Sequence, residues 1–237
     1  MEPDLAVDFL DAYVANYIRE EIQQEALVRN LDSFARFLEV AALVNGQVVN
    51  VAGLARDAGV ARPTVQGYFA TLVDTLLGTW VPAWRKRVKV KEVAGPKFYL
   101  FDPGVARALA GRLREPLDGA ERGFLLETWI LHELRSAAAF LGTGGQISYW
   151  RTPSGSEVDF IWSRGARAIG IEVKASATWR REHGAPLKGL IDAGAVQEGY
   201  GVYTGNAELK DGPIKVMPLH RFLELLAEGR VLTSPDP

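Results

Sequence analysis

The chain has 237 residues, a formal net charge of −2, and hydrophobic and charged fractions of 48% and 24%, which are ordinary for a globular protein with one large or two small domains. The sequence contains no cysteine, which excludes disulfides, thiolate metal sites and a cysteine nucleophile and suits a cytoplasmic protein. No apolar run reaches about 18 residues, so no membrane-spanning helix and no membrane partner are expected.

Residues 1–45 are predicted to form N-terminal helices. Apolar residues recur three and four positions apart, as one face of a helix requires, in FLDAYVANYIREEI and in LDSFARFLEVAALV. Asp32 is the predicted N-cap of the second of these helices.

Residues 46–115 are predicted to form a winged helix-turn-helix. A helix, a turn at Gly59 and a second helix opened by Pro63 are indicated by NVAGLARDAGVARPTVQGYFATLVDTLLG. Two strand-like pieces follow, TWVPAW and KFYLFD, and the segment between them would form the wing.

The predicted wing is strongly basic and runs from Arg85 to Lys97, RKRVKVKEVAGPK. Such a cluster binds phosphates without reading sequence, although a solvated hairpin face is the alternative interpretation. The second helix offers no Arg or Lys for reading base edges, only Gln66, Tyr68 and Thr71, so the unit is also interpretable as a packing or protein-interaction module. The candidate nucleic-acid-binding residues are Arg85, Lys86, Arg87, Lys89, Lys91 and, further along the chain, Arg151.

The polar segment 111–122 is predicted to be a linker to a third domain over residues 120–237. From residue 123 the predicted order is helix, three strands, helix and strand, and the chain ends with the short strand IKVMPL and the helix HRFLELLAEG. The predicted fold class is therefore α/β (α+β).

The stretch SEVDFIWSRGARAIGIEVKAS is predicted to be a hairpin. If its turn is centred between Gly165 and Ala166, Asp159 lies opposite Glu172, and Lys174 lies on the same face as Glu172. Two such carboxylates about 5 Å apart repel by roughly 3 kcal/mol at an effective dielectric constant of about 20, so a nearby cation is required. Lys174 is one candidate, and a divalent metal ion is the other, because Mg²⁺ prefers carboxylate oxygens.

Strict alternation would sort the first strand of this hairpin into two faces. One face would carry Glu157, Asp159 and Ile161, and the other Val158, Phe160 and Trp162. The apolar residues are then expected to point into the core.

This order of elements, with an acid in the second strand and E-x-K in the third, resembles the PD-(D/E)XK nuclease superfamily. The resemblance is carried by Asp159, by Glu172-Val173-Lys174 and by Glu127 on the preceding helix. It implies a restriction-endonuclease-like αβββαβ domain with catalytic Asp159, Glu172, Lys174 and Glu127. Mg²⁺ or Mn²⁺ would be held by Asp159, Glu172, Glu127 and the carbonyl of Val173.

In such a site the metal would polarise a phosphodiester, and Lys174 would steady the developing charge or orient the attacking water. Glu133 is a second candidate for the role of Glu127, but the two lie on opposed sides of a helix, so only one can face the site. The lesser candidates are Glu157 as a ligand and Arg151 and Lys188 as phosphate contacts. The histidines lack metal-ligand spacing and are interpreted as structural, namely His132, His183 and His220.

Most of residues 10–205 more closely resembles the C-terminal region of a bacterial and archaeal family of AAA-type ATPases, described as a domain of unknown function. The matching pieces include FARFLEVAALVNGQVVNVAGLARDAGVARPTVQGYFATL, LLETWILHELR, YWRTPSGSEVDFIW and IGIEVKAS. That region is a winged helix followed by a PD-(D/E)XK-like domain. The sequence lacks the family's ATPase domain and any Walker-type phosphate loop, so ATP hydrolysis is not expected.

The sequence leaves two functions open. The first is a Mg²⁺-dependent endonuclease, or a nuclease-fold unit that binds nucleic acid, chiefly DNA, with help from the winged helix. The alternative is a non-catalytic interaction or regulatory module that binds an ATPase domain or partner protein. The alternative predicts that Asp159→Ala leaves stability unchanged or raised. The substrate form, the oligomeric state and the pathway stay open.

Overall fold

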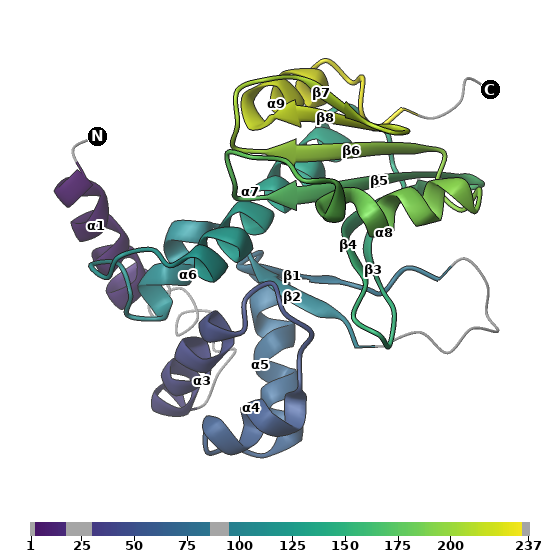
Figure 1. Ribbon diagram of the computed structural model, residues 1–237. Coiled ribbons are helices and arrows are strands. Elements are labelled where there is room, and N and C mark those ends of the chain that lie inside the picture. The colour runs from purple at the N-terminus through teal and green to yellow at the C-terminus, as the bar shows by residue number, and fades with distance from the viewer. Residues whose placement is uncertain (1–2, 18–29, 86–94, 234–237) are drawn as a thin grey trace. The chain divides into compact units, whose positions relative to one another are not determined.

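The computed structural model describes residues 3–17, 30–85 and 95–233 (Figure 1). The chain divides into two compact units, one of residues 1–80 with 97–118 and one of residues 81–96 with 119–237. Helices and strands both contribute, which confirms the predicted α/β class. None of the helices in the described ranges is long and apolar enough to cross a membrane.

The first unit is mainly helical. Its elements are α1 (Pro3–Ala12), the π-helical turn η1 (Tyr13–Tyr17), α3 (Leu31–Leu43), α4 (Val51–Asp57), α5 (Arg62–Asp74), β2 (Lys97–Leu100) and α6 (Pro103–Leu109), and β2 pairs with β1 (Gly78–Val81). The predicted turn between α4 and α5 is confirmed, since Gly59 adopts a φ of 67°, which favours glycine. Pro63 lies in the first turn of α5, where its missing N–H costs nothing.

The predicted N-cap of α3 is wrong. Asn30 precedes the helix in an extended conformation, and its side-chain oxygen accepts the N–H of Ser33 at 3.0 Å. Asp32 instead lies in the first helical turn, where its negative charge favours the helix dipole.

Packing in the first unit buries two of the three polar side chains of α5 that were candidates for contacting bases. Tyr68 is buried against Phe34, with ring centroids 5.0 Å apart, and Thr71 is buried and donates to the carbonyl of Gly67 at 3.1 Å. Of the three polar candidates on this helix, only Gln66 is exposed. Lys97 is buried in β2 and is not part of an exposed basic wing.

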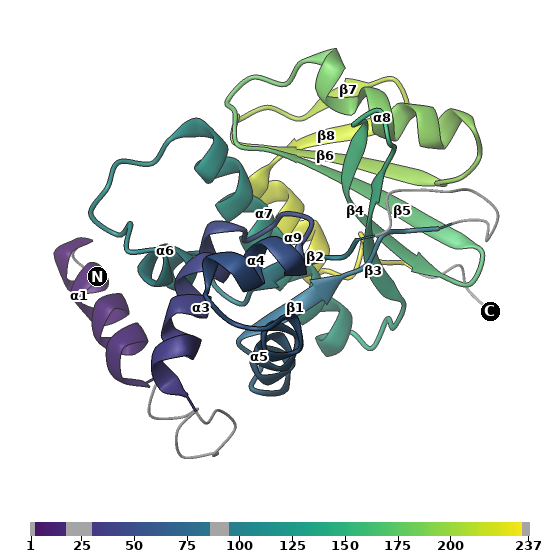
Figure 2. The ribbon, with the colours of Figure 1, turned by 90° about the horizontal axis from the view of Figure 1, so that it is seen from below.

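The second unit contains a six-stranded mixed sheet between helices (Figures 1 and 2). Its elements are α7 (Gly119–Phe140), β3 (Gln146–Arg151), β4 (Glu157–Arg164), β5 (Arg167–Lys174), α8 (Arg181–Asp192), β6 (Glu198–Tyr203), β7 (Leu209–Asp211), β8 (Ile214–Pro218) and α9 (Leu219–Ala227). The spatial order is β3-β4-β5-β6-β8-β7, with β5–β6 and β6–β8 parallel. The predicted order of elements is confirmed, whereas the short edge strand β7 was not predicted.

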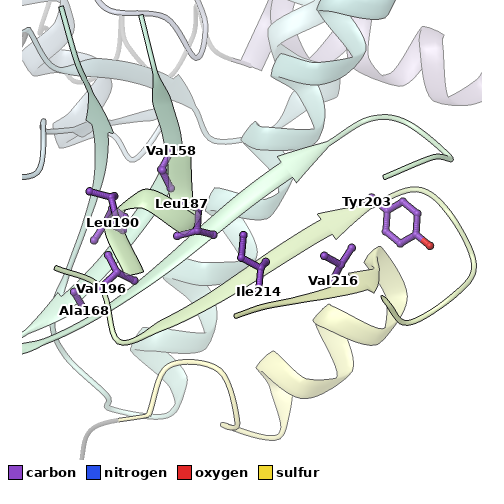
Figure 3. Packing of buried hydrophobic residues seen from close by; sticks show 9 residues of the cluster. Val158, Ala168, Leu187, Leu190, Val196, Tyr203, Ile214 and Val216 are labelled. Atoms are coloured by element: carbon purple, nitrogen blue, oxygen red, sulfur yellow. The ribbon is translucent and has the colours of Figure 1, made fainter. Parts of the chain in front are cut away.

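Helix α8 covers one face of this sheet, and α7 and α9 lie on the other (Figure 1). Leu187 of α8 packs into a buried cluster with Val158, Ile161, Ile214 and further apolar side chains (Figure 3). The close approach depends on glycine, because a Cβ added at Gly170 would lie 2.2 Å from Cδ1 of Leu187.

The predicted register of the β4–β5 hairpin is confirmed. Arg164 pairs with Arg167 and Phe160 pairs with Ile171, so the two-residue turn is Gly165-Ala166. Gly165 adopts a φ of 59°, a conformation that favours glycine in a hairpin turn. The paired residues end at Phe160 and Ile171, and continuing this register by one residue would bring Asp159 opposite Glu172.

Strict alternation along β4 is wrong near Asp159. Between the pairs Ser148–Ile161 and Trp150–Val158, β4 advances by one residue more than β3, which is the signature of a β-bulge. Val158 therefore packs in the same cluster as Ile161 instead of opposite to it. Bulges change the direction in which a side chain points, and this one includes Asp159 or its neighbour.

A short extended segment covers the free edge of β3. Ala83 forms a parallel bridge with Tyr149, whose N–H donates to the carbonyl of Pro82 at 3.0 Å and whose carbonyl accepts the N–H of Trp84 at 2.6 Å. The Tyr149 hydroxyl also donates to the carbonyl of Gly95 at 2.5 Å. The backbone on both sides of residues 86–94 is thus tied to one tyrosine.

Candidate functional site

Asp159, Glu172 and Lys174 form a compact ionic cluster at the open end of the β4–β5 hairpin. Only 6% of Asp159 and 4% of Glu172 is exposed. The ammonium of Lys174 lies 2.5 Å from Oε1 of Glu172 and 3.7 Å from Oδ2 of Asp159. Oδ2 of Asp159 also accepts the backbone N–H of Val173 at 2.7 Å, which fixes the direction of this carboxylate.

The cluster carries more negative than positive charge. Burial raises the pKa of Glu172 well above its ordinary value, and the negative charge of Asp159 raises it further, against the opposing effect of Lys174. For Lys174, burial alone would lower the pKa, but Asp159 and Glu172 together raise it above its usual range. Lys174 therefore stays charged, and Glu172 is the carboxyl group that takes up a proton unless a second cation neutralises it.

One carboxylate oxygen of the cluster has no hydrogen-bond partner among the described residues. Oε2 of Glu172 is fully buried and unpaired. A buried, unpaired anionic oxygen is costly, so such atoms usually have an ion or water as partner. Hard carboxylate and carbonyl oxygens are the donors that Mg²⁺ prefers, so Asp159, Glu172 and the carbonyl of Val173 fit such an ion.

Side-chain ligands alone do not complete this site. Over residues 3–17, 30–85 and 95–233 no group of three or more His, Cys, Asp or Glu side chains is arranged to hold a metal ion. The remaining coordination would therefore come from the Val173 carbonyl, from water, or from a movement of Glu127 toward the pair.

The two helix glutamates differ in their surroundings. The negative charge of Glu127 contributes to raising the pKa of both Glu172 and Lys174, so Glu127 lies within electrostatic reach of the cluster. Glu133 instead accepts a hydrogen bond from Nε1 of Trp129 at 3.0 Å on α7.

The remaining predicted site residues are only partly brought together. Arg151 pairs with Glu157 across β3 and β4, with 3.5 Å between Nε and Oε2, so each restrains the other at the strand ends. Lys188 forms an ion pair with Asp192 on α8. Arg85 is exposed. The other wing candidates lie outside the described residues, namely Lys86, Arg87, Lys89 and Lys91.

His183 is close to this cluster although the sequence indicated only a structural role. Its Nδ1 accepts the N–H of Arg180 at 3.2 Å, and its ring meets Trp179 edge-on with centroids 5.5 Å apart. Burial lowers the pKa of His183, and the positive charge of Lys174 lowers it further. No spacing in the sequence signals this neighbourhood, because His183 belongs to the helix that follows β5.

Comparisons with known proteins find two domain profiles. Residues 2–115 match a domain of unknown function, DUF8612, and residues 122–222 match another, DUF4143. Two relatives, an uncharacterized protein of Mycobacterium bovis and one of Mycobacterium tuberculosis, are each 29% identical over 175 residues, which cover 71% of this chain. The aligned part is 38% of each relative, so the chain spans well under half the length of the curated relatives that it matches.

Proposed function

We propose that the cluster of Asp159, Glu172 and Lys174 hydrolyses phosphodiester bonds of nucleic acid with Mg²⁺ or Mn²⁺ bound. The observation that carries this proposal is the buried, unpaired Oε2 of Glu172 beside a second buried carboxylate. Lys174 compensates one of these two charges, and the remaining charge favours a second cation. The αβββαβ order of the unit and the E-x-K sequence on β5 give further support, because both resemble the PD-(D/E)XK nucleases.

Each residue then has a separate task. Asp159 and Glu172 would hold the ion with the Val173 carbonyl, and Glu127 would complete the shell. The bound ion supplies Lewis-acid activation of the phosphodiester. Lys174, kept charged by the two acids, stabilises the negative charge that develops on the phosphate oxygens.

The substrate is proposed to be DNA, held by phosphate contacts outside the cluster. Arg151 lies on the strand next to the hairpin, and its partner Glu157 is only two residues from Asp159. The basic run from Arg85 to Lys91 adds a second source of positive charge.

A second candidate function is supported by a different observation. Lys174 already donates a hydrogen bond to Glu172, so the negative charge of the cluster is partly neutralised without a metal ion. This is expected of a module that has kept the fold but not the activity. DUF4143 domains are generally associated with AAA-type ATPases, so an ATPase domain is the proposed partner of this alternative. The burial of Tyr68 and Thr71 on α5 also favours a packing role for the first unit.

The experiment that separates the two is a cleavage assay with Mg²⁺ and with Mn²⁺. Single-stranded, duplex and branched DNA and RNA are tested, and Lys174→Ala is expected to lower cleavage at least about 100-fold, the size of effect seen when one charge-stabilising donor is removed. Lys210→Ala is the matched control, because Lys210 is an exposed lysine on the edge strand β7. If wild-type protein cuts none of these substrates with either ion, the nuclease proposal is rejected in favour of the second candidate.

A further inference from the structure

A polar groove lies at the opposite end of the β4–β5 hairpin from the ionic cluster. It has a volume of about 640 Å³ and is lined by the strand ends of β3, β4 and β5 and by the segment that covers the edge of β3. Its polar and aromatic lining consists of Trp84, Arg85, Gln146, Ser148, Ser163 and Arg167. No acidic side chain of the described residues lines it; the charge of Arg167 is compensated by Glu198, so Arg85 supplies its positive charge.

We propose that this groove binds a single-stranded segment of nucleic acid. A positively charged groove with an aromatic wall is the common arrangement for such strands, because the cations meet phosphates and the ring stacks on a base. The volume suits a ligand of nucleotide size, and a hollow of this size admits an unpaired base but not the convex surface of a duplex.

The cationic side of the groove is partly prearranged. Trp84 donates its N–H to the carbonyl of Tyr149 at 2.6 Å, so the backbone that carries Arg85 is tied to β3. Arg167 donates to Glu198 at 2.9 Å and to the carbonyl of Thr233 at 2.7 Å, which holds its guanidinium in place. Arg85 forms no ion pair with an acid of the described residues, so its charge is available to a phosphate.

The aromatic side is equally restrained. Trp84 is partly buried and packs against the apolar cluster between α8 and the sheet. A ring held in this way loses little conformational freedom when a base stacks on it.

The groove and the ionic cluster lie on the same face of the sheet. Gln146 pairs with Ser163, and Ser163 pairs with Ala168, so these three residues share the face of Glu172 and Lys174, whereas Arg167 lies on the opposite face. Six residues of β5 separate Ala168 from Lys174, which is about 20 Å at the rise of a strand. Helix α8 packs on this face between the two, with Leu187 against Gly170, so the groove and the cluster are separate sites. The choice of nucleic acid as ligand rests on the proposed function, whereas the groove's charge and shape do not.

The test is fluorescence anisotropy of a labelled 12-residue oligothymidylate with the full chain in EDTA, so that no cleavage occurs. Arg85→Glu, and independently Ala166→Glu, which places an acid in the exposed turn at the groove, are each expected to raise Kd about tenfold or more and to lower the salt dependence. Arg135→Glu is the matched control, an equal change of charge at an exposed position on α7, and it is expected to stay within about twofold of wild type. Unchanged thermal unfolding of the three variants establishes that they are folded.

The proposal is overturned if both groove variants bind like wild type, if Arg135→Glu weakens binding as much, or if a duplex of the same sequence binds tighter than the single strand. Its failure is distinguishable from failure of the nuclease proposal. Lys174→Ala is expected to bind the oligonucleotide as wild type does, so loss of cleavage with retained binding leaves the groove intact. If the groove variants bind the oligonucleotide and cleave as wild type does, the binding role of the groove is rejected and the nuclease proposal stands.

Discussion

At the scale of single residues, Asp159 has a structural task as well as a proposed chemical one. Its Oδ2 accepts the buried N–H of Val173, so the side chain satisfies a backbone donor while its charge faces Glu172. The expectation from sequence, that Asp159→Ala leaves stability unchanged or raised, considered only the repulsion between the two acids. The hydrogen bond from Val173 stabilises the folded protein, so its loss in Asp159→Ala lowers the stability.

We therefore expect Asp159→Ala to lower the free energy of unfolding by about 1–3 kcal/mol, because it leaves the Val173 N–H buried without a partner. Asp159→Asn keeps an acceptor oxygen and removes the like charge, so its stability is expected to equal or exceed that of wild type. Urea unfolding at neutral pH in EDTA measures both. Equal stability of the Ala and Asn variants would show that the hydrogen bond contributes nothing.

The register of this cluster was accessible from sequence, but its detailed geometry was not. Gly165 and Ala166 indicate a two-residue turn, and the turn fixes which residues of β4 and β5 face one another. The bulge in β4 arises from its pairing with β3, which no local pattern in β4 reveals. The proximity of His183 likewise depends on how α8 packs after β5.

At the scale of elements, the distance between α8 and the sheet is set by glycine. Leu187 occupies the space that a side chain at Gly170 would need. Gly199 on the neighbouring strand is approached by the same leucine, with Cδ2 3.2 Å from the position of an added Cβ. The order and type of these elements were predictable from hydrophobic periodicity. The contact of Leu187 with both Gly170 and Gly199 was not, because it depends on how α8 packs on the sheet.

Gly170→Ala is expected to lower the free energy of unfolding by about 1–3 kcal/mol, the usual cost of overpacking a core. Gly189→Ala is the matched control, since Gly189 lies in α8 with no atom within 4 Å of an added Cβ. It is expected to be neutral or to stabilise by up to about 1 kcal/mol through helix propensity. Chemical denaturation gives both values, and a neutral Gly170→Ala would contradict close packing of α8.

At the scale of the whole molecule, Glu198 connects distant parts of the second unit. It accepts hydrogen bonds from Arg167 on β5, from Lys215 on β8 and from the hydroxyl of Tyr200, and Arg167 also reaches the carbonyl of Thr233. Burial alone would raise the pKa of Glu198, but hydrogen bonds from Lys215 and Tyr200 outweigh it and lower the pKa. Protonation of this one carboxyl therefore weakens several contacts together.

A folded-state pKa below the unfolded value of about 4.3 means that the ionised carboxylate stabilises the protein above that pH. This contribution is lost as the pH falls through the lowered folded-state pKa. Glu198→Gln is expected to lower stability at neutral pH by about 1–2 kcal/mol and to flatten its decline in acid. Urea unfolding between pH 3 and 7 measures this, with the exposed Glu228→Gln as control, and an acid decline as steep as wild type would contradict it.

The extended segment at Pro82–Trp84 has a consequence for self-association. An uncovered edge strand is a template on which another chain adds by backbone hydrogen bonds, and this is a common route to aggregation. In the second unit the Tyr149 side of β3 is already paired with residues of the same chain. The other edge is β7, which is only 3 residues long and carries the exposed Lys210. Both edges of the sheet are therefore poor templates for intermolecular strand addition, one because it is paired and the other because it is short and charged.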